Sequence, residues 1–214
     1  MRKLKAAIFD LDGVIVDTAK YHFLAWKRLS EELGINFTIE DNERLKGVSR
    51  MRSLEIILEI GGIDLSEDVK AQLAEKKNEW YKEYINQMNE SEILKGAREF
   101  ILKLRERGVK TALGSASKNA KTILEKVGLS ELFDVIVDGN VVSKAKPDPE
   151  VFIKAAEQLG IAPESCAVFE DAQAGIQAAK AAGMAAVGIG TKEVLKDADY
   201  IIAGLYEADV NLFN

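Results

Sequence analysis

The sequence has little cysteine and histidine, and it has no long hydrophobic run. Its 214 residues include one cysteine, Cys166, and one histidine, His22. A single cysteine excludes an intrachain disulfide and fits a reducing compartment. Cys166 opens an apolar run, so we interpret it as a small buried residue and not as a reactive thiol. Because no segment approaches the roughly 20 apolar residues of a membrane span, we expect no membrane partner and a cytoplasmic protein.

Basic charge is also scarce. The sequence carries 29 Lys and Arg against 35 Asp and Glu, a net charge of −6 at pH 7. Proteins that bind nucleic acid through a broad basic face have the opposite balance, so we expect no nucleic-acid partner. A local cluster of Lys and Arg can still bind a small anion. The hydrophobic share of 47% is sufficient for a packed core, and without an obvious spare apolar helix we expect a monomer.

Short apolar runs alternate with longer segments of helical periodicity over most of the chain. Several of the helical segments end at glycine, as helices often do. This alternation predicts an α/β fold, with a doubly wound, Rossmann-like parallel sheet covered by helices on both faces. The expected strands are 6–9, 110–113, 135–137, 167–169, 185–187 and 200–202, and the expected helices are 97–107, 118–127, 149–159 and 173–182.

Residues 17–90 break this rhythm, because they contain no convincing strand. Apolar and aromatic residues, Trp26 among them, recur there at helical spacing, which is typical of helices that pack on one another. We therefore predict that 17–90 form an inserted helical cap domain. The core domain then consists of 1–16 and 91–214.

The strongest chemical signal follows the first expected strand. The apolar run at 6–9 leads directly to Asp10, Asp12 and Gly13. Two carboxylates so close repel each other and raise each other's pKa. Such a pair is tolerated when a cation neutralises it or when the two groups have different chemical roles. Asp10 can act as a nucleophile or a Mg²⁺ ligand, and Asp12 as a proton donor and acceptor.

Other polar groups follow other strands, and the carboxyl ends of parallel strands meet at one edge of a sheet. Residues 115–119, Ser-Ala-Ser-Lys-Asn, form a small-residue turn that opens a helix and suits an anion. Lys146 lies in a proline-containing loop, and Glu170 with Asp171 form a second carboxylate pair. An acidic, oxygen-rich set favours Mg²⁺ over zinc. Together these groups predict a site for phosphoryl transfer.

These motifs resemble, in order and over nearly the whole chain, the four motifs of the haloacid dehalogenase superfamily. They are residues 10–13, Ser115, residues 146–149 and the Glu170–Asp171 pair. Dehalogenases of this superfamily lack the second carboxylate, whereas its phosphotransferases use it as acid and base. The presence of Asp12 therefore implies chemistry on phosphate. A helical insert after the first motif is similar to the small cap that closes over the site in this superfamily.

A narrower resemblance is to the β-phosphoglucomutase family. It is carried by residues 17–26, 45–50, 77–78 and 115–119. That family interconverts β-D-glucose 1-phosphate and glucose 6-phosphate. The reaction passes through bound glucose 1,6-bisphosphate, which serves as intermediate and activator. The resemblance therefore implies a sugar phosphate as substrate and Mg²⁺ as cofactor.

The resemblance also implies individual roles. Asp10 would carry the phosphoryl group and Asp12 would move protons. Ser115 and Lys146 would hold the transferring phosphate. Mg²⁺ would be bound by Asp10, the backbone carbonyl of Asp12, Glu170 and Asp171. Thr18 and His22 would act beside the catalytic loop. Substrate binding would involve Trp26, Lys46, Gly47, Val48, Ser49, Arg50, Lys77, Ala116, Ser117, Lys118 and Asn119.

The motifs leave other functions open. A hexose phosphate or phosphoglycolate phosphatase of the same superfamily would share Asp10 and Asp12 but would not need Arg50. Residues 59–72 carry no recognisable site residue, so a disaccharide phosphate or another hexose 1-phosphate stays open as substrate. A signalling receiver domain also has a phosphorylatable aspartate on a doubly wound sheet. That interpretation explains neither Asp12 nor the inserted helices.

Overall fold

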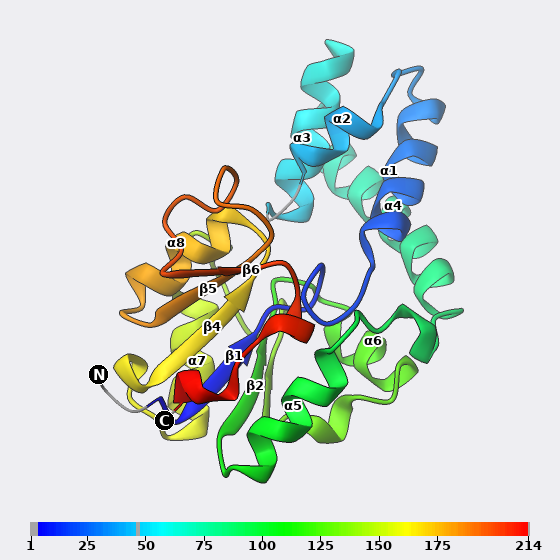
Figure 1. Cartoon of the computed structure of the whole chain (residues 1–214). Helices are drawn as coiled ribbons and strands as arrows, with labels where there is room; N and C mark the ends of the chain where they lie inside the picture. Colours follow the sequence, from blue (N-terminus) through cyan, green and yellow to red (C-terminus); the bar gives the residue numbers. More distant parts are fainter. Residues whose placement is uncertain (1–3, 46–47, 214) are drawn as a thin grey trace. The chain divides into compact units, whose positions relative to one another are not determined.

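The structure is a computed structural model that describes residues 4–45 and 48–213 (Figure 1). Its chain divides into two compact units. One consists of residues 1–17 and 88–214, and the other of residues 18–87. Within the described ranges, no helix combines the length and the apolar character needed to cross a membrane.

The larger unit is built on one six-stranded parallel sheet with the order β3-β2-β1-β4-β5-β6. The chain starts in the middle of the sheet, adds strands on one side and then on the other, which makes the sheet doubly wound. The predicted fold class is confirmed. The strands are β1 Ala6–Phe9, β2 Lys110–Gly114, β3 Val135–Val137, β4 Cys166–Glu170, β5 Ala185–Ile189 and β6 Tyr200–Ile202. The bounds of β1, β3 and β6 are those predicted, and the other three strands are longer by one or two residues.

Helices and short turns connect these strands. The helices are α5 Ala97–Glu106, α6 Ala120–Lys126, α7 Glu150–Leu159 and α8 Gln173–Ala181. The 3-10 turns are η1 Glu90–Glu92, η2 Ser130–Leu132, η3 Pro163–Ser165, η4 Leu205–Glu207 and η5 Val210–Phe213. All four helices lie within two residues of the ranges that the sequence predicts.

Successive residues of β1 point to opposite faces of the sheet and meet different helices. Ile8 belongs to the apolar cluster that α7 and α8 contribute to. The ring of Phe9 stacks on Phe169 of β4 at 4.8 Å and meets Phe100 of α5 edge-on at 6.2 Å. This alternation follows from the pleat of a strand. Burial on both faces explains why the strands are continuous apolar runs.

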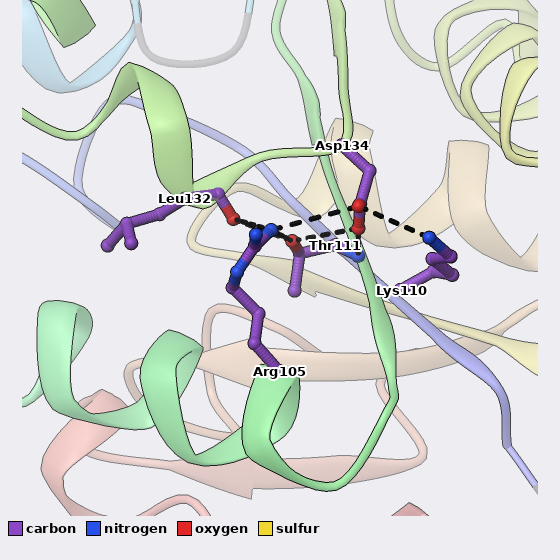
Figure 2. A network of polar contacts seen from close by, with 5 residues as sticks. All are labelled: Arg105, Lys110, Thr111, Leu132 and Asp134. Carbon is purple, nitrogen blue, oxygen red and sulfur yellow. Dashed lines mark hydrogen bonds and ion pairs between the residues drawn. The ribbon is translucent and has the colours of Figure 1, made fainter.

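An aspartate immediately before each edge strand fixes the register of that strand. Asp134 precedes β3. Its N–H donates to the carbonyl of Thr111 at 2.8 Å, and its Oδ2 accepts the N–H of Thr111 at 2.9 Å. Asp199 precedes β6 and makes the same two bonds with Ala186, at 2.9 and 2.8 Å. Lys110 adds an ion pair with Asp134 at 3.3 Å (Figure 2). Two edge strands of only three residues are thereby held at their amino ends.

The smaller unit contains four helices and no strand among its described residues. The helices are α1 Ala19–Glu32, α2 Ile39–Glu43, α3 Arg50–Gly61 and α4 Glu67–Ile85. Helix α4 packs against α1 and α3, and the buried residues of those two helices include Leu29, Leu54 and Ile57. The hydroxyl of Ser49 caps α3 by accepting the N–H of Arg52 at 3.2 Å.

Candidate active site

The turn after β1 presents the first carboxylate at the carboxyl edge of the sheet. Asp10 continues the β1–β4 ladder, because its N–H donates to the carbonyl of Phe169 at 3.0 Å. Its Oδ2 accepts the N–H of Asp12 at 3.1 Å. Gly13 adopts a φ of 78°, which other residues rarely adopt, and a Cβ there would lie 2.1 Å from Oδ2 of Asp171. Glycine therefore lets this turn approach the end of β4 closely.

Three carboxylates converge at this edge. One oxygen each from Asp10, Glu170 and Asp171 lies within 4.8 Å of the others. The carboxylate of Glu170 is also packed against α8, because a Cβ at Gly175 would lie 1.9 Å from its Oε1. Its Oε2 accepts the N–H of Ala172 at 2.8 Å. The Ala172 N–H and the close approach of the α8 backbone at Gly175 therefore fix the orientation of the Glu170 carboxylate. Only glycine at position 175 permits this approach.

A buried lysine lies among these carboxylates. Lys146 Nζ lies 2.5 Å from Oδ1 of Asp10 and 2.5 Å from Oε1 of Glu170. It also lies 4.8 Å from the ring centre of Phe152. Burial disfavours the ammonium, but the two carboxylates outweigh this effect and raise the pKa of Lys146. The lysine is therefore charged near neutral pH.

The crowding of these carboxyl groups suppresses their ionisation, which a bound cation would reverse. Burial raises the pKa of Asp171 to about 8, and the neighbouring charges of Glu170, Asp10 and Asp12 act in the same direction. Burial likewise raises the pKa of Glu170 to about 7, against the opposing effect of Lys146. Crowded carboxylate oxygens without nitrogen or sulfur ligands are the donor set that Mg²⁺ takes. The residues present thus fit a Mg²⁺ ion bound by Asp10, Glu170 and Asp171.

The predicted phosphate-binding turn follows β2, the strand beside β1. Ser115 is buried, and its N–H donates to the carbonyl of Val137 at 3.0 Å. Its hydroxyl accepts the N–H of Ser117 at 3.1 Å, and the hydroxyl of Ser117 accepts the N–H of Asn119 at 3.3 Å. In the described part of the chain, no protein acceptor takes the N–H of Ala116 or Lys118. These two donors are available to an anion.

The loop that carries Lys146 is held by a residue that sequence reasoning missed. Oε2 of Glu150 accepts the N–H and the hydroxyl of Ser143, at 2.9 and 3.0 Å, and the N–H of Lys144 at 2.7 Å. The bond from Lys154 and that from the Lys144 N–H are the main causes that lower the pKa of Glu150 to about 2. The sequence signal for this role is an acidic residue in the first turn of a helix that follows a polar loop.

The smaller unit gathers several other predicted residues around one lysine. Lys77 Nζ lies 3.0 Å from Nδ1 of His22, 4.5 Å from the ring centre of Trp26 and 4.8 Å from that of Tyr81. Burial, and then the charges of Lys77 and Arg50, lower the pKa of His22 well below its ordinary value. The imidazole is therefore neutral near pH 7, and its Nδ1 accepts from the ammonium of Lys77.

The other predicted residues of this unit have mixed placements. Arg50 is the first residue of α3 and pairs with Glu75 at 3.1 Å. Thr18 is buried, and its carbonyl accepts the N–H groups of Tyr21 and His22 at the start of α1. Val48 is half-buried. Lys46 and Gly47 lie outside the described residues.

The doubly wound sheet and the acidic edge with its buried lysine define a class of phosphate-handling enzymes. A family model described as haloacid dehalogenase-like hydrolase matches residues 4–183. The chain therefore belongs to the haloacid dehalogenase-like hydrolase family.

Similar proteins narrow the class. The chain is 44% identical to a β-phosphoglucomutase of Bacillus subtilis, over 93% of this chain and 89% of that protein. It superposes on the crystal structure of a β-phosphoglucomutase from Clostridium difficile with a TM-score of 0.92 and 40% identity, over 97% of this chain and 94% of that one. It is also 33% identical to a phosphorylated carbohydrates phosphatase of Thermotoga maritima, over 85% and 82% of the two chains. The expected likeness to the β-phosphoglucomutase family is confirmed.

Proposed function

We propose that this protein is a Mg²⁺-dependent β-phosphoglucomutase that interconverts β-D-glucose 1-phosphate and glucose 6-phosphate through glucose 1,6-bisphosphate. The observation that carries this proposal is the cluster of Asp10, Lys146, Glu170 and Asp171, found in a chain 44% identical to a β-phosphoglucomutase. The cluster supplies a nucleophile and the charges that phosphoryl transfer needs. The similarity to a β-phosphoglucomutase indicates a sugar phosphate as the substrate.

Asp10 and Asp12 divide the chemistry. A carboxylate oxygen of Asp10 attacks the 1-phosphorus of bound glucose 1,6-bisphosphate, the bond between that phosphorus and the sugar oxygen breaks, and a phosphoaspartate forms while glucose 6-phosphate leaves. Asp12 donates its proton to the departing sugar oxygen. In the second half, Asp12 takes the proton of the 6-hydroxyl of β-D-glucose 1-phosphate, whose oxygen attacks the phosphorus of the phosphoaspartate. This step re-forms glucose 1,6-bisphosphate and releases Asp10. Each half-reaction thus returns the acid and base to the state that the next one needs.

Fixed positive charge stabilises the transferring group. Lys146 offsets the charge of Asp10, and in this proposal its ammonium also contacts the phosphoryl oxygens. The hydroxyl of Ser115 and the N–H of Ala116 donate to the same group. Bound Mg²⁺ would neutralise the carboxylates and polarise the phosphoryl oxygens. Mg²⁺ and the bisphosphate activator belong to this proposal.

A mutase also has to hold the phosphate that is not transferred. We assign this phosphate to Ser117, Lys118 and Asn119 of the larger unit and to Arg50 of the smaller unit. A guanidinium is well suited to two-point contact with phosphate. The other substrate-side residues of this proposal are Thr18, His22, Trp26, Lys46, Gly47, Val48, Ser49 and Lys77.

A sugar phosphate phosphatase is the second candidate. The 33% identity to a phosphorylated carbohydrates phosphatase favours it. Such an enzyme would use the same Asp10 and Asp12, with water in place of the second sugar hydroxyl. A cytoplasmic location, a monomeric state and the absence of a nucleic-acid partner stay predictions from the sequence.

Phosphorus NMR separates the two candidates. The protein is mixed with Mg²⁺, β-D-glucose 1-phosphate and a trace of glucose 1,6-bisphosphate. A mutase converts the substrate into glucose 6-phosphate with little free phosphate. Free phosphate as the main product would make the protein a phosphatase, and no turnover would overturn the assignment of glucose as its sugar.

A further inference from the structure

The turn at residues 115–119 is supported from outside by a second loop, residues 138–140. The N–H of Gly139 donates to the carbonyl of Ser117 at 3.1 Å, and Nδ2 of Asn140 donates to the carbonyl of Lys118 at 2.9 Å. Two successive carbonyls of the turn are therefore tied to one neighbouring loop. Neither Gly139 nor Asn140 belongs to the motifs that indicate the reaction.

Peptide planarity converts these two bonds into an orientation of the turn. In a trans peptide the C=O and the N–H point in opposite directions. The carbonyl of Ser117 shares its peptide with the N–H of Lys118, so the bond to Gly139 turns that N–H away from the supporting loop. The carbonyl of Lys118 shares its peptide with the N–H of Asn119, which donates to the hydroxyl of Ser117. The support thus fixes both peptides that flank Lys118.

The supporting loop is itself held rigidly. The N–H of Asn140 donates to Oδ1 of Asp138 at 2.9 Å, and its Nδ2 donates to Oδ2 of the same residue at 3.2 Å. Asp138 is buried. The backbone of Gly139 lies so close to the turn that a Cβ there would be 2.2 Å from the carbonyl oxygen of Ala116. Glycine at 139 is required by this close approach.

We propose that Asn140 is a positioning residue for phosphate recognition, acting through the backbone of Lys118 to hold the 115–119 turn in its anion-binding form. Asn140 does not touch the substrate. Its amide keeps the backbone around Lys118, and with it the Lys118 N–H, directed to the phosphate that is not transferred. This inference rests on the proposed function for the identity of the substrate. The contacts that support the turn are independent of that function.

The chain offers a matched control. Asn211 makes the same two bonds with the aspartate two residues before it, at 2.9 Å from its N–H and 3.3 Å from its Nδ2 to Asp209. It lies in η5, far along the chain from the 115–119 turn. Asn211→Ala therefore removes a similar local bond, together with an exposed bond from Arg107 at 3.3 Å, without the link to Lys118.

Kinetics and NMR test the inference together. Asn140→Ala should raise KM for β-D-glucose 1-phosphate about tenfold, the effect of one lost hydrogen bond of typical strength, with a smaller change in kcat. Asn140→Asp, which has similar size but no amide donor, should behave in the same way, and Asn211→Ala should match the wild type. In amide NMR, titration with inorganic phosphate should shift the Ala116 and Lys118 resonances at higher phosphate concentration in Asn140→Ala than in the wild type.

The outcomes separate this inference from the proposed function. If the wild type converts the sugar phosphate and Asn140→Ala equals Asn211→Ala in KM and in phosphate titration, the positioning role is wrong. If the wild type has no mutase activity but Asn140→Ala still weakens phosphate binding at Lys118, the role stands and the proposed function fails. Melting temperatures of the variants show whether a loss reflects unfolding, and Asn140→Asp decides the case if Asn140→Ala does not fold.

Discussion

Lys146 and Asp10 are 136 positions apart in sequence, and their charged atoms lie 2.5 Å apart. The contact joins the turn after β1 to the loop before α7. It places the positive charge of the lysine beside the carboxylate that we propose as nucleophile. It also offsets part of the repulsion among the three carboxylates of the site, of which Asp10 and Glu170 are buried and Asp171 is half-buried.

Removing this lysine should therefore cost stability as well as activity. Lys146→Met should lower the free energy of unfolding by about 3 kcal/mol in metal-free buffer, the usual effect of leaving buried charges without their partner. Saturating Mg²⁺ should reduce this loss, because the ion neutralises the same carboxylates. Urea unfolding with and without Mg²⁺ measures both. Lys144→Met is the control, since Lys144 pairs with Asp148 on the exposed part of the same loop. Equal losses in the two variants would contradict the account.

Mg²⁺ binding should release protons near neutral pH. Asp171 has a pKa of about 8 and Glu170 of about 7 in the folded, metal-free protein, whereas unfolded carboxyls titrate near pH 4. The folded state therefore holds extra protons between about pH 4 and 8, and its stability without metal falls as the pH rises through that range. Calorimetry of Mg²⁺ binding at pH 6.5 in buffers of different ionisation enthalpy should show proton release and an affinity that rises with pH. Binding without proton release would contradict the raised pKa values.

The aspartates before the edge strands should matter for stability and not for catalysis. Asp134→Ala and Asp199→Ala should each lower the free energy of unfolding by about 1–2 kcal/mol, because each leaves a backbone N–H of the neighbouring strand without its side-chain acceptor. The two losses should add, since the residues lie at opposite edges of the sheet.

The pH dependence of these two variants has a defined sign. Hydrogen bonds from Thr111 and Lys110 lower the pKa of Asp134 in spite of the opposing effect of burial. The stability that Asp134 contributes is therefore present above the ordinary aspartate pKa and is lost as the pH falls below it. Urea midpoints at neutral and acidic pH check this, and a reduced kcat in either variant would show that the sheet edges influence the site.

Arg50 should distinguish mutase turnover from hydrolysis. Arg50→Ala should slow the conversion of β-D-glucose 1-phosphate about 100-fold, because a charged contact with phosphate is lost. The same substitution should affect the hydrolysis of an aryl phosphate far less. Arg52→Ala is the matched control on the same helix, since Arg52 pairs only with the exposed Glu55 and Glu59 among the described residues. Equal losses of both activities in Arg50→Ala would argue against a second phosphate site.

Much of the fold could be predicted because its signals are local. The strands are short apolar runs bounded by polar turns, and the insert is helical because its apolar residues recur every three or four positions. The position of Asp10 and Asp12 at a strand end follows from the same pattern. The doubly wound sheet then brings the ends of β1, β2 and β4 to one edge, which is why the site residues of the larger unit could be grouped before the structure was known.

The parts that could not be predicted are contacts between segments far apart in sequence. The bonds of Glu150 to the Lys146 loop and of Asn140 to Lys118 depend on how loops meet in space, and neither residue carries a motif of its own. The ion pair of Arg50 with Glu75 depends in the same way on how α3 packs against α4. The roles assigned to the site residues stay predictions until they are measured.

The central claim is that Asp10 carries the phosphoryl group. The direct test is to mix the protein with Mg²⁺ and glucose 1,6-bisphosphate, quench the mixture in acid and map phosphate on the peptides by mass spectrometry, with borohydride reduction of an acyl phosphate to homoserine as a second readout. The account predicts phosphate, and after reduction homoserine, at position 10, and neither in a folded Asp10→Asn variant. Phosphate on another residue, or full turnover by Asp10→Asn, would contradict it.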